Sequence, residues 1–347
     1  MLLVLGLAAL IWFGGALMRL PRGVRGAMIL LLWLGALSIQ LSLPDGSPLR
    51  EATGGSAAVW LILAGCVIVL GAYARLVSAL KARAQPKDQD VTQKPGKFSE
   101  TELNRYARHI VLREIGGPGQ KKMKQARVLV IGAGGLGAPA LQYLAAAGIG
   151  TIGVIDDDEV ENANLQRQVI HRDADIGMPK VFSAQNAMQA QNPNVVVQPY
   201  NRRLTEEIAE ELFAEFDLIL DGTDNFETRY LANRVAVKLG KPLISGALSQ
   251  WEGQLSLFHP GSDGPCYQCI FPEAPAPGLV PSCAEAGVVG PLPGVIGAMM
   301  AVEAIKQITG AGAVLRGEML IYDGLYGETR KIRLSKRGDC PVCGSAE

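Results

Sequence analysis

Residues 127–137 read RVLVIGAGGLG, an apolar β-rich run that leads directly into a glycine-rich loop. The next segment, LGAPALQYLAAAG (136–148), has the composition of a helix, and TIGVID (151–156) reads as a second strand. A strand, a G-x-G-x-x-G loop and a helix in this order can bind a phosphate through backbone amides at the helix N-terminus. This stretch therefore predicts a parallel sheet with a nucleotide at its carboxyl edge.

Short β-rich runs continue to alternate with helical segments after this unit. VVVQPY, LILDG and PLISG read as strands, separated by the helical segments PKVFSAQNAMQAQ, TEEIAEELFAEF and NFETRYLANRVAVKLG. Later strands are expected at WEGQLSLFHP, EMLIYDG and TRKIRL, with a buried helix at PGVIGAMMAVEAIKQITG. The alternation predicts a doubly wound, Rossmann-like α/β fold, with a mostly parallel sheet covered on both faces and antiparallel strands added later.

Several side chains beyond the glycine loop fit a nucleotide triphosphate. Asp156 follows the second strand about 20 residues after the glycines, where a carboxylate can hold a ribose hydroxyl. Arg167, Lys180 and the loop DGTDN (221–225) come next. A cationic pair with a carboxylate able to hold magnesium fits a triphosphate better than a dinucleotide. The glycines alone would also fit a simple tight turn, and an NAD-dependent oxidoreductase would share both the loop and Asp156.

Four of the six cysteines form two C-x-x-C pairs, Cys266 with Cys269 and Cys340 with Cys343. Two such pairs can complete a tetrahedral zinc site, although the gap between them is longer than in ordinary zinc fingers. A disulfide framework is disfavoured in a reducing cytoplasm. A redox C-x-x-C usually begins a helix, which neither pair does clearly. The pattern favours zinc and leaves the redox alternative open.

The N-terminal part of the chain is apolar. Three uncharged stretches, Met1–Met18, Gly26–Leu43 and Ala52–Ala74, each approach the ~20 residues that cross a bilayer as a helix. A cleaved signal peptide is the alternative for the first stretch, but it has no positive leading segment and no clear cleavage site. We therefore expect residues 1–80 to form a membrane segment with two or three transmembrane helices.

Basic residues predict the orientation of this segment, because Lys and Arg accumulate on the cytoplasmic side of a membrane. They lie in the first loop and after the third stretch, at Arg19, Arg22, Arg25, Arg75, Lys81, Arg83 and Lys87. We expect the rest of the chain to face the cytoplasm from the inner membrane, with a flexible linker over 81–97 and an ATP-binding domain over 98–347. In that domain, Ser99 and Glu102 fit a capping box that opens a helix through roughly Ile115.

Charge and histidine content exclude other classes of function. The formal net charge is +0, which argues against nucleic acid as a partner. With only three histidines in the chain, chemistry based on clustered imidazoles is not expected. Carboxylates, cysteines and backbone amides remain as the functional groups.

From about Phe98 to Gly344 the chain resembles the MoeB/ThiF/HesA family, bacterial relatives of ubiquitin-activating enzymes. The matching motifs, in the family's order, are RYARHI, GAGGLGAP, NLQRQV, GMPKV, DGTDN, CYQC, EAGVVGP and CPVC. The resemblance implies an adenylyltransferase that uses ATP and magnesium to activate the C-terminal carboxylate of a ubiquitin-like sulfur-carrier protein ending in Gly-Gly. A separate sulfur donor protein would then act, in molybdopterin, thiamine or related biosynthesis.

The resemblance also implies roles for individual residues. Arg167 would be catalytic and, with Asn164 and Lys180, would hold the phosphates, while Asp156 would hold the ribose and Asp224 a magnesium ion. The remaining ATP-binding positions would be Gly132, Gly134, Gly135, Gly137, Asp158 and Asn225.

Arg108 would be catalytic in trans, reaching the triphosphate of the partner in a homodimer. The resemblance further implies that Cys266, Cys269, Cys340 and Cys343 bind a structural zinc that clips the C-terminal end to the domain. Cys283 would carry the sulfur covalently in some relatives, whereas others adenylate without it. A third reading is a membrane-tethered module that binds the carrier without turnover, but intact Arg167 and Asp224 argue against it.

Overall fold

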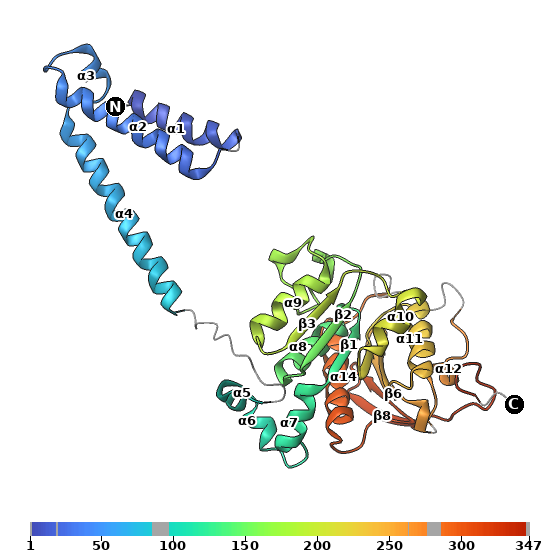
Figure 1. Cartoon of the computed structure of the whole chain (residues 1–347). Coiled ribbons are helices and arrows are strands. Elements are labelled where there is room, and N and C mark those ends of the chain that lie inside the picture. The colour runs from blue at the N-terminus through green and yellow to red at the C-terminus, as the bar shows by residue number, and fades with distance from the viewer. Residues whose placement is uncertain (1, 19, 85–96, 263, 276–285, 345–347) are drawn as a thin grey trace. The chain divides into compact units, whose positions relative to one another are not determined.

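The computed structural model describes residues 2–18, 20–84, 97–262, 264–275 and 286–344 (Figure 1). The chain divides into two compact units, Met1–Thr92 and Gln93–Glu347, and we describe each by itself.

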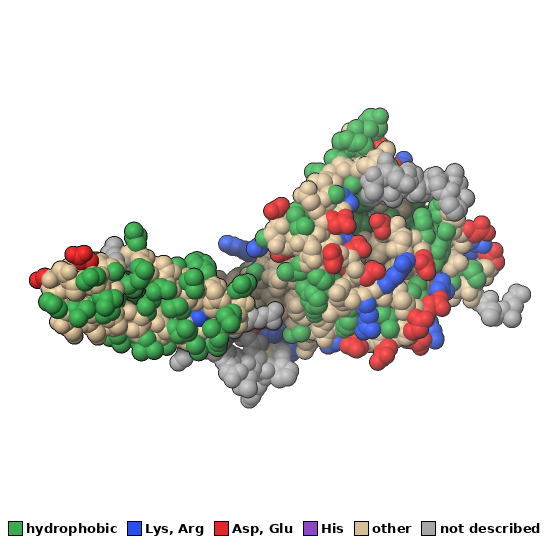
Figure 2. Space-filling view, turned by 90° about the horizontal axis from the view of Figure 1, so that it is seen from above, with side chains coloured by type: hydrophobic (Ala, Val, Ile, Leu, Met, Phe, Trp, Pro, Cys, Tyr) green, Lys and Arg blue, Asp and Glu red, His purple; other side chains and the backbone are tan. Residues whose placement is uncertain are grey.

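The N-terminal unit is made of three apolar helices, α1 (Leu2–Leu17), α2 (Arg22–Ser42) and α4 (Ala57–Ala84), and a short helix with two charged residues, α3 (Pro48–Ala52). Two stretches, Gly23–Ser42 and Pro48–Val77, are long and apolar enough to cross a membrane by length and composition, while α1 is shorter. Hydrophobic side chains cover the visible face of this unit, with few charged ones among them (Figure 2). Membrane insertion of these helices remains a prediction.

The third apolar stretch, Ala52–Ala74, begins at the last residue of α3 and continues in α4 after a short turn. Gly54 and Gly55 adopt positive φ angles of 129° and 72°, which other residues rarely adopt, and they separate α3 from α4. Trp60 packs this turn onto α2 by donating its indole N–H to the Thr53 carbonyl (3.0 Å). Gln40 on α2 donates to the Thr53 hydroxyl (2.8 Å) and to the Arg50 carbonyl oxygen (2.8 Å), so its amide joins the turn to α2.

The second unit is built on one eight-stranded sheet of order β3-β2-β1-β4-β5-β6-β7-β8. The first five strands are parallel, and β6, β7 and β8 join them antiparallel. The strands are β1 (Arg127–Ile131), β2 (Thr151–Ile155), β3 (Val196–Tyr200), β4 (Leu218–Asp221), β5 (Leu243–Leu248), β6 (Glu252–Phe258), β7 (Glu318–Asp323) and β8 (Glu328–Arg333). The predicted doubly wound sheet with later antiparallel strands is confirmed.

Helices cover both faces of this sheet (Figure 1). One face packs against α7 (Gly116–Gln125), α8 (Gly137–Ala147), α9 (Lys180–Gln191) and α14 (Pro291–Thr309). The other face packs against α10 (Glu206–Ala214), α11 (Phe226–Lys238) and the short α12 (Tyr267–Ile270). The strands are therefore buried on both sides, as their continuous apolar character requires.

The capping box at Ser99 and Glu102 is confirmed, but the single helix expected to run to Ile115 is wrong. The chain instead forms α5 (Glu100–Arg105) and α6 (Ala107–Ile110), which are interrupted at Tyr106. Tyr106 is buried at the end of α8, where its ring occupies the space beside Gly148; a Cβ on that glycine would lie 2.4 Å from Tyr106 Cζ. A tertiary contact therefore decides where the helix breaks.

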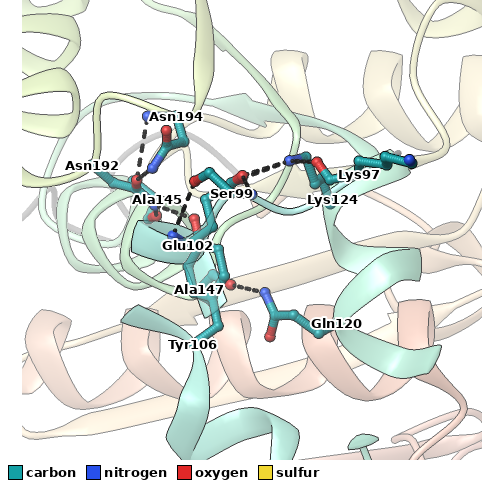
Figure 3. A network of polar contacts seen from close by, with 10 residues as sticks. All are labelled: Lys97, Ser99, Glu102, Tyr106, Gln120, Lys124, Ala145, Ala147, Asn192 and Asn194. Carbon is teal, nitrogen blue, oxygen red and sulfur yellow. Dashed lines mark hydrogen bonds and ion pairs between the residues drawn. The ribbon is translucent and has the colours of Figure 1, made fainter. Parts of the chain in front are cut away.

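A polar network holds these N-terminal helices against the domain (Figure 3). Asn192 donates to both the Tyr106 hydroxyl (2.8 Å) and the Ala145 carbonyl (2.7 Å). Lys124 donates to the Glu102 carboxylate (2.7 Å), so the capping residue also bonds to α7. The network fixes α5 and α6 beside the C-terminal end of α8.

Candidate nucleotide and metal sites

The glycine-rich loop is closed by backbone contacts that no larger residue could make. Gly132 has a φ of +91°, and a Cβ on Gly137 would lie 1.8 Å from the Gly132 carbonyl oxygen. The loop therefore turns tightly from β1 into the N-terminus of α8. Gly134 and Gly135 lie between them, at the place where backbone amides can face an anion.

Asp156 lies immediately after β2 and bonds to this loop. Its carboxylate accepts from the backbone N–H groups of Ala133 (2.7 Å) and Asp158 (2.9 Å). Burial raises the pKa of Asp156, while the nearby Lys180 ammonium and the two backbone donors oppose the rise. The carboxylate predicted to hold a ribose is thus placed at the edge of the glycine loop.

Lys180 begins α9 and is a buried cation, only 4% exposed. Its Nζ donates to the Asp158 carboxylate at 2.6 Å. The Asp158 side chain is 67% exposed, so one face of this ion pair is open to solvent. A phosphate oxygen could therefore replace the Asp158 carboxylate oxygen as the partner of the Lys180 ammonium, and one negative charge would take the place of another.

Arg167 and Asn164 lie together in the segment that follows Asp158, at the end of the short 3-10 turn Asn162–Asn164. Arg167 Nη2 donates to Asn164 Oδ1 (2.9 Å). The same arginine passes beside Gly135, where a Cβ would lie 3.9 Å from Arg167 Cδ. The structure therefore brings the predicted phosphate-binding side chains next to the glycine loop.

The DGTDN loop follows β4 and packs against the glycine loop, since a Cβ on Gly132 would lie 3.3 Å from the Gly222 carbonyl oxygen. Asp224 is exposed, and Asn225 caps α11 by accepting from Thr228 N–H (2.9 Å). Among the described residues, Asp156, Asp157 and Asp158 form a group of three carboxylates whose oxygens lie within 4.8 Å of one another, and Asp224 does not belong to it. Because β2, β1 and β4 are adjacent and parallel, all these loops meet at one sheet edge.

Sequence reasoning missed three buried residues at this edge. Asp221, the last residue of β4, is 1% exposed and forms an ion pair with Arg229 on α11 (3.4 Å). His171 lies between the Ala133 carbonyl oxygen (2.9 Å) and the Ser183 hydroxyl (2.9 Å), behind the glycine loop. Burial lowers the pKa of His171. The one sequence signal for Arg229 is a cation on a helix that is otherwise largely apolar on its inner face.

Arg108 lies at the other end of α8 from the glycine loop. It is exposed on α6 and lines a cavity of about 380 Å³ together with Tyr143 and Val302. The cavity contacts α8 between Tyr143 and Ala147, which lie about 9 to 15 Å along the helix from Gly137 in the glycine loop of the same chain. Cys283, a third residue with an expected catalytic role besides Arg108 and Arg167, lies outside the described residues.

The four cysteines of the two C-x-x-C pairs come together although they are distant in sequence. Their Sγ atoms are 3.6 Å apart for Cys266 and Cys340, 3.3 Å for Cys269 and Cys343, and 3.9 Å for Cys266 and Cys269. A tetrahedral zinc with sulfur ligands at about 2.3 Å places its sulfurs about 3.8 Å apart, so the group fits this metal. No disulfide joins any of these four described cysteines.

The surroundings of the cluster act unequally on its thiols, because burial raises the pKa of Cys266 and that of Cys343. Burial opposes ionisation, but backbone N–H groups of Cys343 and Val342 bring the pKa of Cys340 down to about 7. The backbone N–H of Arg337 also donates to Cys269 Sγ (3.5 Å). Such donors hold a metal-ligating sulfur in its charged form.

The ThiF family profile matches residues 106–342. The chain is 50% identical over 252 residues to "Sulfur carrier protein adenylyltransferase" of Thermus thermophilus, covering 72% of this chain and 93% of that protein. It is 48% identical to "SAMP-activating enzyme E1" of Haloferax volcanii, covering 70% and 90%. The fold resembles a crystal structure of E. coli MccB with MccA-N7isoASN, with a TM-score of 0.63 at 24% identity, covering 71% and 76%; that likeness concerns the fold alone.

Proposed function

Since this chain belongs to the ThiF family, we propose that it is an ATP-dependent adenylyltransferase acting on a ubiquitin-like sulfur-carrier protein. The reaction joins the carrier's C-terminal glycine carboxylate to AMP and releases pyrophosphate. The acyl-adenylate is then the substrate of a separate sulfur donor protein.

One observation supports this function above the others: 50% identity over nearly the full length of a relative named sulfur carrier protein adenylyltransferase. The geometry agrees with that name. Arg167 and Lys180 lie at the same sheet edge as the glycine loop and Asp156, where they can neutralise a triphosphate. When a carboxylate attacks the α-phosphate, negative charge develops on the leaving pyrophosphate, and fixed cations stabilise it without proton transfer.

Magnesium and zinc are the metals we propose for the two sites. Asp224 would hold magnesium between the phosphates, where the ion would neutralise charge. Cys266, Cys269, Cys340 and Cys343 would hold a structural zinc that is closed to substrate, because all four ligands are protein sulfurs.

An NAD-dependent oxidoreductase is the alternative enzyme class, and it would share the glycine loop and Asp156. It gives no role to Lys180, which is buried at the site and forms an ion pair with the exposed Asp158 carboxylate. A module that binds the carrier without turnover would have no use for this cation or for Arg167. The charge at the sheet edge therefore favours phosphate chemistry.

The proposed function predicts ATP–pyrophosphate exchange that depends on a carrier. Radiolabelled pyrophosphate should enter ATP when the purified chain is mixed with Mg-ATP and a ubiquitin-like protein ending in Gly-Gly. A carrier lacking its last glycine is the control, and it should support no exchange. Tight NAD binding without carrier-dependent exchange would replace the adenylation model with the oxidoreductase model.

We further propose that residues 1–80 anchor the enzyme in the inner membrane, with 81–97 as linker and 98–347 in the cytoplasm. The apolar α2 and α4 and the basic residues flanking them support this arrangement. A reporter fused after Lys87 should give a cytoplasmic signal. A periplasmic signal would contradict the topology and would also separate the domain from its ATP.

We also propose that the enzyme is a homodimer in which Arg108 reaches the partner's triphosphate. The separation of Arg108 from the glycine loop of its own chain supports a role in trans.

A further inference from the structure

Arg229, in the second turn of α11, is a buried arginine that bonds to several groups at the sheet edge. It is 5% exposed. Its Nη1 donates to the Ser245 hydroxyl (3.0 Å) and pairs with the Asp221 carboxylate (3.4 Å). Its Nη2 donates to the carbonyl oxygens of Thr223 and Gly246 (2.8 Å for Gly246). One guanidinium thus joins the end of β4, the DGTDN loop and β5.

Asp221 receives further bonds that shape the loop. Its Oδ1 accepts from the Thr223 backbone N–H (3.1 Å) and hydroxyl (2.7 Å), so Thr223 is held through both its N–H and its carbonyl. Asp224 and Asn225 follow directly, and Asn225 is the N-cap of α11. The position of Asp224 therefore depends on a loop held by Arg229.

One turn after Arg229, Asn233 connects the same helix to the cysteine cluster. Asn233 is 1% exposed. Its Oδ1 accepts from Tyr267 N–H (2.9 Å), and its Nδ2 donates to Cys266 Sγ (3.6 Å). Residues four apart on a helix lie on one face, so Arg229 and Asn233 face inward together. Tyr267 lies beside both, and burial raises the pKa of Tyr267 to about 12 while the Arg229 guanidinium opposes that rise.

We infer that Arg229 is a positioning residue for the Asp221–Asn225 loop, and that Asn233 couples this loop to the cysteine cluster through α11. The inference rests on the proposed function, because it treats the loop as part of a Mg-ATP site. It gives the cysteine cluster a second effect besides holding the C-terminal end: a well-ordered cluster raises the affinity of the domain for the nucleotide.

Lysine cannot replace Arg229 in this arrangement. A guanidinium has five N–H donors in one plane and can bond to four acceptors on three segments. An ammonium is a point charge with three donors on a flexible stem. Arg229→Lys should therefore keep the charge beside Asp221 and lose the bridge to the carbonyl oxygens of Thr223 and Gly246.

The test measures affinity of the purified full-length chain for a non-hydrolysable Mg-ATP analogue by calorimetry, with zinc content and Tm measured in parallel. We expect Arg229→Gln to raise Kd about 10- to 100-fold with zinc content unchanged, since such a loss corresponds to one or two charged hydrogen bonds. Arg229→Lys should give an intermediate value, and KM should change more than kcat. Arg234→Gln is the matched control, because Arg234 lies on the same helix with an exposed side chain paired to Glu206, and its Kd should stay within twofold.

Coupling is tested by a double-mutant cycle. Asn233→Ala should raise Kd for the analogue several-fold, and Arg229→Gln combined with Asn233→Ala should raise it by less than the product of the single effects. Additive effects would overturn the coupling, and a Kd for Arg229→Gln within twofold of wild type would overturn the positioning role. If Arg229→Gln fails to fold, Arg229→Lys takes its place in the cycle. A wild-type chain that binds no Mg-ATP analogue would overturn the proposed function itself.

Discussion

Lys180→Met should lower carrier-dependent ATP–pyrophosphate exchange by roughly 10²–10³-fold, the usual effect of removing one fixed charge that stabilises a transition state. Lys180 is 4% exposed and its ammonium group lies 2.6 Å from an exposed carboxylate, that of Asp158. Methionine has a similar length and apolar stem but no charge. The fold should therefore persist, and the loss should appear as slower exchange of labelled pyrophosphate at saturating ATP.

The control for this change is Lys238→Met on α11. Lys238 is a surface lysine that also forms a 2.6 Å ion pair, with Glu210, so the substitution removes the same charge away from the sheet edge. Exchange should stay within about twofold, because exposed ion pairs contribute little. A Lys180→Met enzyme that keeps more than a fifth of wild-type exchange would contradict a role for Lys180 in phosphate chemistry.

The same variant tests the dimer. If Arg108 acts in trans, a dimer of one Arg108→Ala subunit and one Lys180→Met subunit contains one intact site. Co-expression of the two inactive variants should then restore about a quarter of wild-type exchange, since half of randomly formed two-fold dimers are mixed and each has one working site. Exchange that stays at the level of the single variants would place Arg108 outside the partner's site.

The fold could be predicted from the sequence because each strand and helix is indicated by the residues within it and next to it. The parallel strands β1 and β4 are short apolar runs, RVLVI and LILD, and their length and their alternation with helical segments identify them as strands. The helix break at Tyr106 could not be predicted, since it depends on a ring packed beside Gly148, about forty residues away, which no local pattern encodes.

The residues of the site also divide into those that the sequence could predict and those that it could not. The glycine loop, Asp156 and Lys180 could be found because a motif follows a strand at a known spacing. Arg229 could not, because its function depends on acceptors from β4, the DGTDN loop and β5, which become neighbours only in the folded sheet. The motif drew attention to the exposed Asp224, whereas the buried Asp221 holds the loop together.

Cys340→Ser should remove the bound zinc and lower the free energy of unfolding by more than about 3 kcal/mol, because metal binding in such sites is also folding energy. The Cys340–Cys343 pair contacts the domain at the cluster: Cys340 Sγ lies 3.6 Å from Cys266 Sγ, and the backbone N–H of Arg337 bonds to Cys269 Sγ. Serine is smaller, harder and a poor zinc ligand. Metal analysis should find about one zinc per wild-type chain and much less in the variant, with a lower Tm.

Cys66→Ser is the matched control, since Cys66 lies exposed on α4 outside the cluster, and it should change neither zinc content nor the Tm of the domain.

The loss of zinc in Cys340→Ser should also affect α11. Asn233 bonds to Cys266 and to Tyr267 between the paired cysteines, so loss of the metal should loosen the helix that carries Arg229. Mg-ATP affinity should therefore fall in Cys340→Ser before the chain unfolds. A zinc-free variant with wild-type stability would contradict the metal site, and one with lower stability but unchanged Mg-ATP affinity would confine the metal to clipping the C-terminal end.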